Sequence, residues 1–376
     1  MRIRPRAWLF PLLAAATTLT VVLVTVPGDG GSRDGRPRAG TVAAPAPAGK
    51  AKPDARDVVL AVHGGAGTAL VRDETSPEKE KAYRDGLERA LRAGQKSLDR
   101  GASSVEAVEA AVNVLEDDPL FNAGKGAVFT ADAGHELDAS IMRGSDLEAG
   151  AVAGVKHVRN PITAARLVME KSKHVMLAGQ GADDFAVEQG LKPVTQDHFW
   201  TQRRWDQLME AKGKKSAAEK DRNKDRDEDR DEAKGTVGAV AIDREDDMAA
   251  ATSTGGMTNK MAGRVGDSPI IGAGTYAKNG TVAASATGDG EIFIRGAATA
   301  TISNLMEFGG KDVARASYEV LVKRLPKLGG TGGVIALDAK GVFDAPHSSE
   351  GMLHGYLTKD GKLVTKIFKE ESPPNQ

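Results

Sequence analysis

The chain has 376 residues, of which 40% are hydrophobic, so it is long enough for a sizeable core and one or two domains. Its formal net charge is -1 and only 4% of its residues are aromatic, which argues against a nucleic-acid or other polyanionic partner. Because the chain has no cysteine, disulfides, thiolate metal sites, a cysteine nucleophile and a lipid-modified cysteine anchor are excluded.

The first 26 residues have the pattern of an export signal. Three arginines within residues 2–6 precede an uncharged, mostly apolar run, and small residues follow it. Because about 20 apolar residues can span a bilayer, an uncleaved membrane anchor is the alternative. We expect an exported protein, secreted or periplasmic, with residues 1–26 as a signal peptide or as an anchor that leaves the folded part outside. Residues 27–56, rich in Gly, Pro, Ala and charges, predict a flexible linker.

The folded part is expected to begin at Asp57 with a buried strand at residues 58–62, which leads into the glycine-rich stretch HGGAG at residues 63–67. A glycine-rich loop after a strand can cradle a phosphate. Here the next helical pattern is delayed until Pro77, and no acidic partner for a ribose follows in a βαβ unit. Dinucleotide binding is therefore disfavoured, and we assign no role to His63.

Helical and strand patterns alternate along the rest of the chain. Apolar residues recur at helical spacing from Tyr83 to Leu98, and Ser103 with Glu106 forms the capping-box pattern of a second helix. Residues 128–190 mix short strand patterns with helical ones. Two further helices and a hairpin are expected at residues 297–308, 313–325 and 333–344. This mixture indicates layered α and β structure.

The composition changes abruptly at residues 212–234, which carry many charges of both signs and almost no apolar side chains. Such a segment cannot bury a face, so it predicts a mobile spacer, with a solvated helix as the alternative. It ends at Gly235 and Thr236, after which residues 237–242 and 248–253 predict two adjacent strands. Those strands would place Thr254, at the end of the second, beside Thr236.

Thr236 is a candidate nucleophile if the chain is cut in front of it. A threonine hydroxyl reacts poorly at neutral pH unless a base lies beside it. Cleavage after Gly235 would give Thr236 a free α-amino group with a reference pKa of about 8, so that one residue supplies both nucleophile and base. Gly235 lacks Cβ and tolerates the backbone angles that an N-to-O acyl shift requires. The alternative is a buried strand threonine after a loop glycine.

Arg264 and Asp267 form a candidate binding pair for an amino acid. An amino acid moiety carries an α-carboxylate and an α-ammonium, and an arginine and an aspartate a short turn apart can hold both. Arginine suits this role because its guanidinium binds a carboxylate through two parallel hydrogen bonds. The alternative is an ordinary surface ion pair.

Five stretches together resemble a known family: LAVHGGAGT, LEDDPLFNAGKGAVFTADAGHELDASIMRG, GTVGAVAID, ATSTGGMTNKMAGRVGDSPIIGAGTYA and ATGDGEIFIR. They resemble the plant-type asparaginases, or isoaspartyl peptidases, which are N-terminal nucleophile hydrolases, over residues 58–358 apart from the charged spacer. The resemblance implies an α+β fold, a four-layer αββα sandwich. It also implies a precursor that cuts itself into an α chain, residues 57–235, and a β chain, residues 236–376, and a dimer of such αβ units.

The same resemblance implies roles for individual residues. Thr236 becomes the nucleophile, and Thr254 becomes a hydroxyl partner that tunes it. The simpler alternative for Thr254 is a threonine at a strand end that caps its own backbone. Thr287 and Gly288 match an oxyanion hole, whose donors are each worth about 3 to 4 kcal/mol of barrier. The remaining matches are Arg264 for the substrate α-carboxylate, Asp267 for its α-amine, Gly290 for the pocket lining and Asn122 beside the scissile bond.

No cofactor is implied for catalysis, but a structural sodium ion is. In the family, main-chain carbonyls of a loop bind sodium, and a hard cation accepts such oxygens readily. The matching positions are Leu115, Glu116, Asp118, Phe121, Ala123 and Lys125. Asp118 stands where many relatives carry a cysteine, and position 125 varies in the family. The alternative is an ordinary helix-ending loop with Pro119 as a breaker.

The sequence thus predicts an exported hydrolase of L-asparagine and β-aspartyl dipeptides whose Thr236 is freed by self-cleavage. Two near alternatives within the superfamily stay open, a glycosylasparaginase-like enzyme and an Asp-specific threonine protease. An alternative of another class is an exported amino-acid-binding protein that keeps Arg264 and Asp267 but is never processed.

Overall fold

The computed structural model describes residues 52–67, 72–218 and 235–371. The predicted signal or anchor at residues 1–26 lies outside these ranges, as do most of the predicted linker and residues 219–234 of the predicted spacer. Within the ranges, no helix combines the length and the apolar character needed to cross a membrane.

A large sheet of eight strands lies at the centre of the fold, in the order β12-β11-β1-β5-β6-β2-β3-β4. Its strands are antiparallel except for β3 and β4, which run parallel. Their bounds are β1 Val58–Ala66, β2 Leu137–Arg143, β3 Ala149–Val155, β4 Met176–Ala178, β5 Val237–Ile242, β6 Met248–Thr254, β11 Met352–Thr358 and β12 Leu363–Lys366.

A second, smaller sheet packs on one face of the first. Its antiparallel strands follow the order β10-β9-β8-β7. Their bounds are β7 Thr275–Ala277, β8 Val282–Gly288, β9 Gly332–Asp338 and β10 Phe343–Asp344. The predicted hairpin at residues 333–344 is therefore confirmed as β9 and β10.

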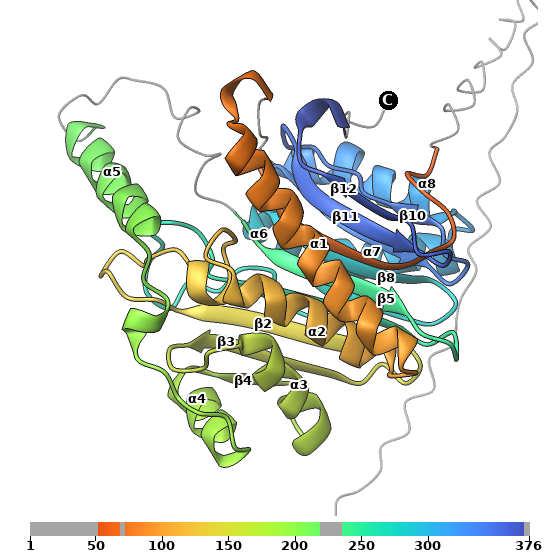
Figure 1. The fold of residues 1–376 in the computed structure, drawn as a ribbon, viewed down its shortest axis with the longest axis horizontal. Coiled ribbons are helices and arrows are strands. Elements are labelled where there is room, and N and C mark those ends of the chain that lie inside the picture. Colours follow the sequence, from red (N-terminus) through yellow and green to blue (C-terminus); the bar gives the residue numbers. More distant parts are fainter. Residues whose placement is uncertain (1–51, 68–71, 219–234, 372–376) are drawn as a thin grey trace, which may run out of the picture. The chain divides into compact units, whose positions relative to one another are not determined.

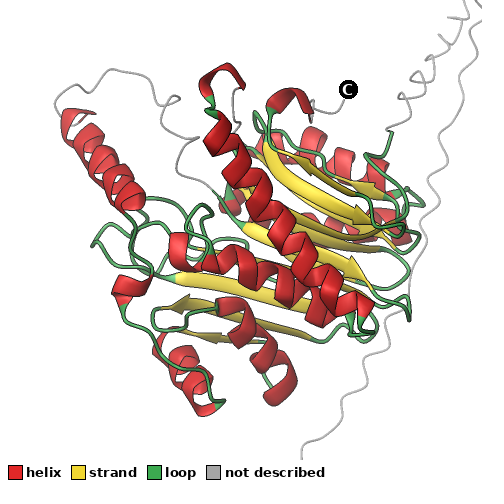
Figure 2. Cartoon of the chain, in the orientation of Figure 1, coloured by secondary structure: helices red, strands yellow, loops and turns green. Residues whose placement is uncertain are grey.

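Helices cover the outer faces of both sheets (Figures 1 and 2). On the large sheet lie α1 Pro77–Asp99, α2 Ser104–Asp117, α3 Pro161–Lys171 and α4 Gly179–Glu188, and α5 Gln202–Ala218 follows them in the chain. On the small sheet lie α6 Gly290–Gly296, α7 Ala298–Glu307 and α8 Val313–Tyr318, the last continued by a π-helix Glu319–Arg324 and a 3-10 turn Leu325–Leu328. Further 3-10 turns are Arg72–Glu74, Gly124–Gly126, Gln196–His198 and Lys369–Glu371.

Three hydrophobic cores separate these four layers, which confirms the predicted αββα sandwich. Side chains alternate between the two faces of a strand. In β5, Val237 and Ala239 accordingly face the core under α1–α4, while Val240 faces the core between the two sheets. In β8, Ala284 faces the core under α6–α8, while Ala283 faces the core between the two sheets.

The two predicted N-terminal helices are confirmed. Ser103 caps α2, accepting the N–H of Glu106 while the Glu106 carboxylate accepts the N–H of Ser103. Ser76 caps α1 by accepting the N–H of Lys79, and Pro77 occupies the first turn, where its missing N–H costs nothing.

Three segments differ from expectation. The first strand does not end before the glycine-rich stretch but runs through it to Ala66, with an irregularity in its pairing at Gly65. The folded part begins before Asp57, since Ala55 exchanges backbone hydrogen bonds of 3.2 and 3.0 Å with Phe343. The predicted spacer is helical at its start, because α5 continues as far as Ala218. The lysines and alanines within residues 212–218 favour a helix, which outweighs the cost of Gly213.

Candidate active site

The β5–β6 pairing brings the two candidate threonines together. Val237 pairs with Ser253 across the two strands, so Thr236 and Thr254 lie side by side where β5 begins and β6 ends. The Thr236 hydroxyl donates to Thr254 Oγ1 at 3.2 Å, and both residues are buried. The sequence-based prediction that adjacent strands place these hydroxyls together is confirmed.

The carbonyl of Gly235, in front of Thr236, is held by two donors. Thr254 Oγ1 donates to it at 3.1 Å, and Asn122 Nδ2 donates to it at 2.7 Å. Asn122 is itself fixed, because its Nδ2 also donates to Gly256 O at 2.6 Å and its Oδ1 accepts the N–H of Val128 at 3.0 Å. Donors aimed at a carbonyl oxygen stabilise the negative charge that develops there when the carbon is attacked.

Glycines let the backbones around this bond approach closely. A Cβ on Gly65, whose φ is 121°, would lie 3.1 Å from the Cα of Gly235. A Cβ on Gly64 would lie 2.5 Å from the ring of Phe121. The glycine-rich stretch of β1 therefore packs against the candidate cleavage site.

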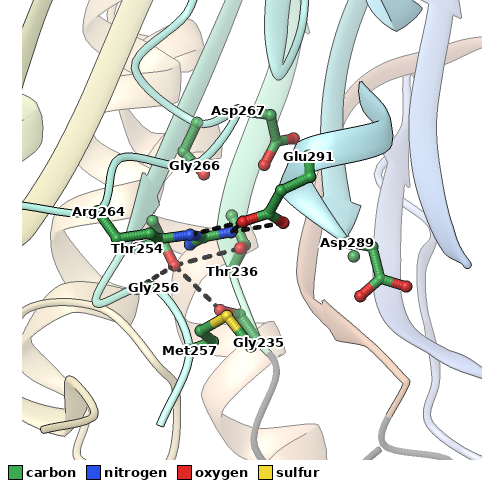
Figure 3. Close-up of a pocket in the computed structure, with 12 residues that line it drawn as sticks. Gly235, Thr236, Thr254, Gly256, Met257, Arg264, Gly266, Asp267, Asp289 and Glu291 are labelled. Carbon is green, nitrogen blue, oxygen red and sulfur yellow. Dashed lines mark hydrogen bonds and ion pairs between the residues drawn. The ribbon is translucent and has the colours of Figure 1, made fainter. Parts of the chain in front are cut away.

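A small pocket opens on Thr236 (Figure 3). Its volume is about 20 Å³, close to the space that one water needs, which is roughly 15 Å³. The described residues that line it are Gly235, Thr236, Thr254, Gly256, Met257, Arg264, Gly266, Asp267, Ser268, Gly288, Asp289 and Glu291. This space is too small for an amino acid.

Arg264 and Asp267 both reach this pocket, from the loop that follows β6. The Arg264 guanidinium is paired with Glu291, with Nε to Oε1 and Nη2 to Oε2 both at 3.0 Å (Figure 3). Asp267 is buried and its Oδ2 has no hydrogen-bond partner in the described part of the chain. Burial raises the pKa of Asp267 to about 7. A buried carboxylate without a partner is a suitable acceptor for an incoming ammonium.

The predicted oxyanion residues at the end of β8 differ in their surroundings. Gly288 lines the pocket, with φ of 139° and a hypothetical Cβ only 2.4 Å from the Cα of Gly332. Thr287 is buried behind it, where its hydroxyl accepts the N–H of Ala66 at 3.1 Å. Gly290 lies against the binding pair, since a Cβ there would meet Oδ1 of Asp267 at 2.9 Å.

The predicted sodium loop folds back on itself between α2 and the 3-10 turn at Gly124. A Cβ on Gly124 would lie 2.3 Å from the carbonyl oxygen of Glu116, and one on Gly126 would lie 2.0 Å from that of Phe121. Only glycines leave room for these two carbonyls, so the backbone is tightly folded at the loop that was predicted to bind sodium. The described residues hold no cluster of three His, Cys, Asp or Glu suited to a metal, so an ion here would depend on carbonyls.

Sequence reasoning missed two features of this region. Glu291 lies in the quoted ATGDGE motif, but nothing local signals its pairing with Arg264, 27 residues away. His63 begins a buried polar network below Thr236, with Nε2 at 2.9 Å from Ser285 Oγ, which lies 2.7 Å from Thr252 Oγ1. Burial lowers the pKa of His63 to about 3, so it is neutral there.

Known proteins resemble most of the chain. A family model described as asparaginase matches residues 56–367. The isoaspartyl peptidase of Escherichia coli (strain K12) is 49% identical over 313 residues, which cover 83% of this chain and 97% of that protein. The isoaspartyl peptidase/L-asparaginase of Mus musculus is 42% identical over 313 residues, covering 82% of this chain and 90% of that protein. A probable isoaspartyl peptidase/L-asparaginase 2 of Arabidopsis thaliana is 38% identical over 326 residues, which cover 82% of this chain and 98% of that protein.

The match spans both sheets, the paired threonines and the pocket with Arg264 and Asp267, and it extends over nearly the whole length of each relative. A single family model thus covers every element that positions the candidate site. The chain belongs to the asparaginase family and is a hydrolase.

Proposed function

We propose that the chain cuts itself between Gly235 and Thr236 and then hydrolyses L-asparagine and β-aspartyl dipeptides with Thr236 as nucleophile. The observation that carries this proposal is the chain of hydroxyls, in which Thr236 donates to Thr254 and Thr254 donates to the Gly235 carbonyl. The names of the relatives, isoaspartyl peptidase and L-asparaginase, support the substrate class.

Self-cleavage follows from this arrangement. Thr236 Oγ1 attacks the Gly235 carbon while its proton moves to Thr254, and Thr254 passes its own proton to the Gly235 oxygen. Asn122 stabilises the negative charge that develops on this oxygen during the attack. When the tetrahedral adduct collapses, the carbonyl re-forms, its hydroxyl proton moves to Thr236 N, and the C–N bond breaks, so that an ester joins the two chains. Water hydrolyses the ester, leaving a carboxylate on Gly235 and a free α-amino group on Thr236.

Turnover uses the same hydroxyl with the new amine as base. The substrate α-carboxylate binds Arg264 and its α-ammonium binds Asp267, which places the side-chain carbonyl at Thr236. Thr236 Oγ1 attacks that carbonyl, and Gly288 and Thr287 hold the oxyanion. The C–N bond breaks as the leaving nitrogen takes a proton, so ammonia or an amino acid departs. Water then releases L-aspartate and restores Thr236.

The pocket must enlarge before a substrate can bind. In the uncut chain, Gly235 lines a space of about 20 Å³. Release of Gly235 from its hydrogen bonds with Asn122 and Thr254 would open that space. Processing and substrate binding are thereby coupled, because one residue blocks the pocket until it is cut away.

The decisive experiment is the intact mass and N-terminal sequence of purified protein after incubation at neutral pH. The wild-type chain is expected to give a fragment that begins Thr-Val-Gly-Ala-Val, and a Thr236→Ala variant is expected to stay whole. A Thr236→Ser variant, which keeps a hydroxyl, is the matched control and should be cut. An uncut wild-type chain would favour the unprocessed amino-acid-binding protein, and equilibrium binding of L-aspartate would then test that alternative.

The other superfamily activities are separated by substrate. One preparation of the processed protein is assayed with four substrates, and the turnover rates are compared. The substrates are L-asparagine, β-aspartyl dipeptides, glycosyl-asparagine and a protein that can be cleaved after Asp. We expect the first two to be hydrolysed and the last two to be spared. Preferential hydrolysis of glycosyl-asparagine or of the protein would replace the proposed substrate class.

Three further properties complete the proposal: export directed by residues 1–26, a dimer of processed αβ units, and a sodium ion bound by main-chain carbonyls of the loop. The sequence pattern supports export, and the glycines at positions 124 and 126 support the ion site. Cell fractionation with N-terminal sequencing tests export and distinguishes cleavage from membrane anchoring. Sedimentation tests the dimer, and thermal unfolding in NaCl against choline chloride at equal ionic strength tests the ion.

A further inference from the structure

A second cavity meets the substrate pocket at Gly235. Its volume is about 240 Å³, more than ten times that of the small pocket on Thr236. The described residues that line it are Gly64, Lys79, Tyr83, Leu120, Asn122, Arg203, Arg204, Gln207, Gly235 and Leu353. Gly235 is the only described residue that lines both spaces, so it forms the wall between them.

The described lining of this basic cavity carries three cations and no carboxylate. Lys79, Arg203 and Arg204 make no ion pair with any carboxylate in the part of the chain that the structure describes. Arg204 is only 6% exposed, and its pKa is lowered by burial to about 9, so it remains charged at neutral pH. A buried charge without a partner of opposite sign is costly, and this cost applies to Arg204, since Lys79 and Arg203 are exposed. With three cations on its lining, the cavity favours an anion.

Two of these cations are held in place by neutral groups. Arg203 donates to the hydroxyl of Tyr83 at 3.2 Å and to the carbonyl of Leu120 at 2.7 Å. Arg204 donates from Nε to Gly126 O at 2.7 Å and from Nη1 to Gln207 Oε1 at 3.0 Å. These bonds orient the guanidinium groups without neutralising them. A pre-oriented guanidinium loses little entropy when it binds a planar carboxylate.

We propose that the basic cavity binds the α-carboxylate of the amino acid that leaves when a β-aspartyl dipeptide is cleaved. This inference rests on the proposed function. The aspartyl half of the substrate would lie toward Arg264 and Asp267, so its leaving half must extend away from them, past Thr236. That is where Gly235 stands in the uncut chain, and its departure joins the two spaces. The covalent steps are those of the turnover reaction. The amino acid leaves with its nitrogen as a free amine, and its α-carboxylate is the group that the basic cavity binds.

The proposal predicts a difference between substrates. A dipeptide with a free C-terminal carboxylate uses the cavity, whereas L-asparagine releases ammonia, which has no carboxylate. The cavity therefore selects β-aspartyl dipeptides over asparagine through the Michaelis constant. A dipeptide whose C-terminus is an amide keeps the size of the leaving group but loses its charge.

The experiment compares these three substrates on the wild-type protein and on the double variant Lys79→Gln, Arg203→Gln. For the free-acid dipeptide we expect KM to rise about fivefold to tenfold, since hydrogen bonds to charged groups are among the stronger ones. KM for the amide and for L-asparagine should change less than about twofold. Lys81→Gln is the matched control, because Lys81 lies on the same helix, pairs with Asp85 and does not line the cavity.

Two outcomes would overturn the proposal. An equal rise in KM for the acid and the amide would mean that the substitutions alter the cavity without removing a charge contact. An unchanged KM for the acid, with faster trimming of the α chain by carboxypeptidase, would assign the cavity to the new carboxylate of Gly235 instead. A free N-terminus at Thr236 verifies that each variant has folded and processed. Failure of the wild-type protein to hydrolyse any of the three substrates would refute the proposed function, not the cavity alone.

Discussion

The two sides of the pocket on Thr236 are built in different ways. On the nucleophile side, Thr236 and Thr254 sit at the ends of neighbouring strands, so the register of β5 and β6 alone fixes their separation. On the recognition side, Arg264 and Asp267 come from a loop, and Arg264 forms an ion pair with a residue of another layer, Glu291. The proposed reactions use the sides differently, because self-cleavage needs only the first whereas turnover needs both.

The largest expected effect is on the nucleophile side. Thr254→Ala should slow self-cleavage by about 100-fold or more, because a positioned group that transfers a proton contributes at least that factor. Thr254 is the residue that links the Thr236 hydroxyl to the Gly235 oxygen. The time course of fragment formation, followed by mass spectrometry, measures the effect. Thr254→Ser retains the hydroxyl, and its rate of self-cleavage should lie within about tenfold of the wild-type rate. If Thr254→Ala were cut at the wild-type rate, proton transfer through Thr254 would be excluded.

The matching change on the recognition side should leave self-cleavage unchanged and weaken turnover. Asp267→Asn is expected to be cut at the wild-type rate but to lose about 30-fold or more in kcat/KM for L-asparagine, because a buried ammonium would be left without its charged partner. Steady-state kinetics of the processed variant measure the loss. Slow cleavage of this variant would show that the two sides are not separable.

The pH dependence of kcat/KM sharpens the same contrast. Burial raises the pKa of Asp267 to about 7, so its carboxylate is protonated as the pH falls through about 7. The protonated form cannot pair with an ammonium, and kcat/KM should therefore fall on the acid side of pH 7. In Asp267→Asn the contribution of Asp267 to this acid limb should be absent, and only the protonation of the Thr236 α-amine, which must be free to act as base, should remain. An acid limb of the same shape in the variant and the wild type would assign the whole limb to that amine and not to Asp267.

The difference between the sides also explains what could be predicted from the sequence. Alternating strand patterns at residues 237–242 and 248–253 are local, and they were sufficient to place Thr254 beside Thr236. The capping box at Ser103 is likewise local and was correct. The Arg264–Glu291 pair joins a loop to α6 on the other sheet, and no short-range pattern encodes such a contact. Composition also could not show that Gly64 and Gly65 belong to a strand, because their need for close packing arises only when Phe121 and Gly235 are in place.

A smaller effect is expected at the end of α2, away from both sides. Burial raises the pKa of Glu116 to about 8, while its Oε1 accepts Ser253 Oγ at 2.6 Å and the N–H of Ile162 at 3.0 Å. The folded state favours the protonated acid, so the free energy of unfolding should fall as the pH rises from about 4.5 to about 8. Glu116→Gln resembles the protonated acid and should be more stable than wild type at pH 9 by about 1 kcal/mol or more.

Chemical unfolding of both proteins at pH 5 and pH 9 measures this difference. Near pH 5 the two should be similar, because the wild-type side chain is then protonated in the fold. A variant that is destabilised equally at both pH values would show that the wild-type carboxyl is held by its hydrogen bonds in the charged form.

The smallest effect is expected at Glu291. Its side chain is 59% exposed, and an exposed ion pair contributes about 1 kcal/mol or less. A substrate carboxylate must share the Arg264 guanidinium with Glu291, whose negative charge opposes it. Glu291→Gln should therefore lower KM for L-asparagine by no more than about threefold, with kcat and self-cleavage unchanged. A tenfold rise in KM would mean that Glu291 holds Arg264 in its binding position, and the recognition side would then depend on the small sheet as strictly as the nucleophile side depends on the large one.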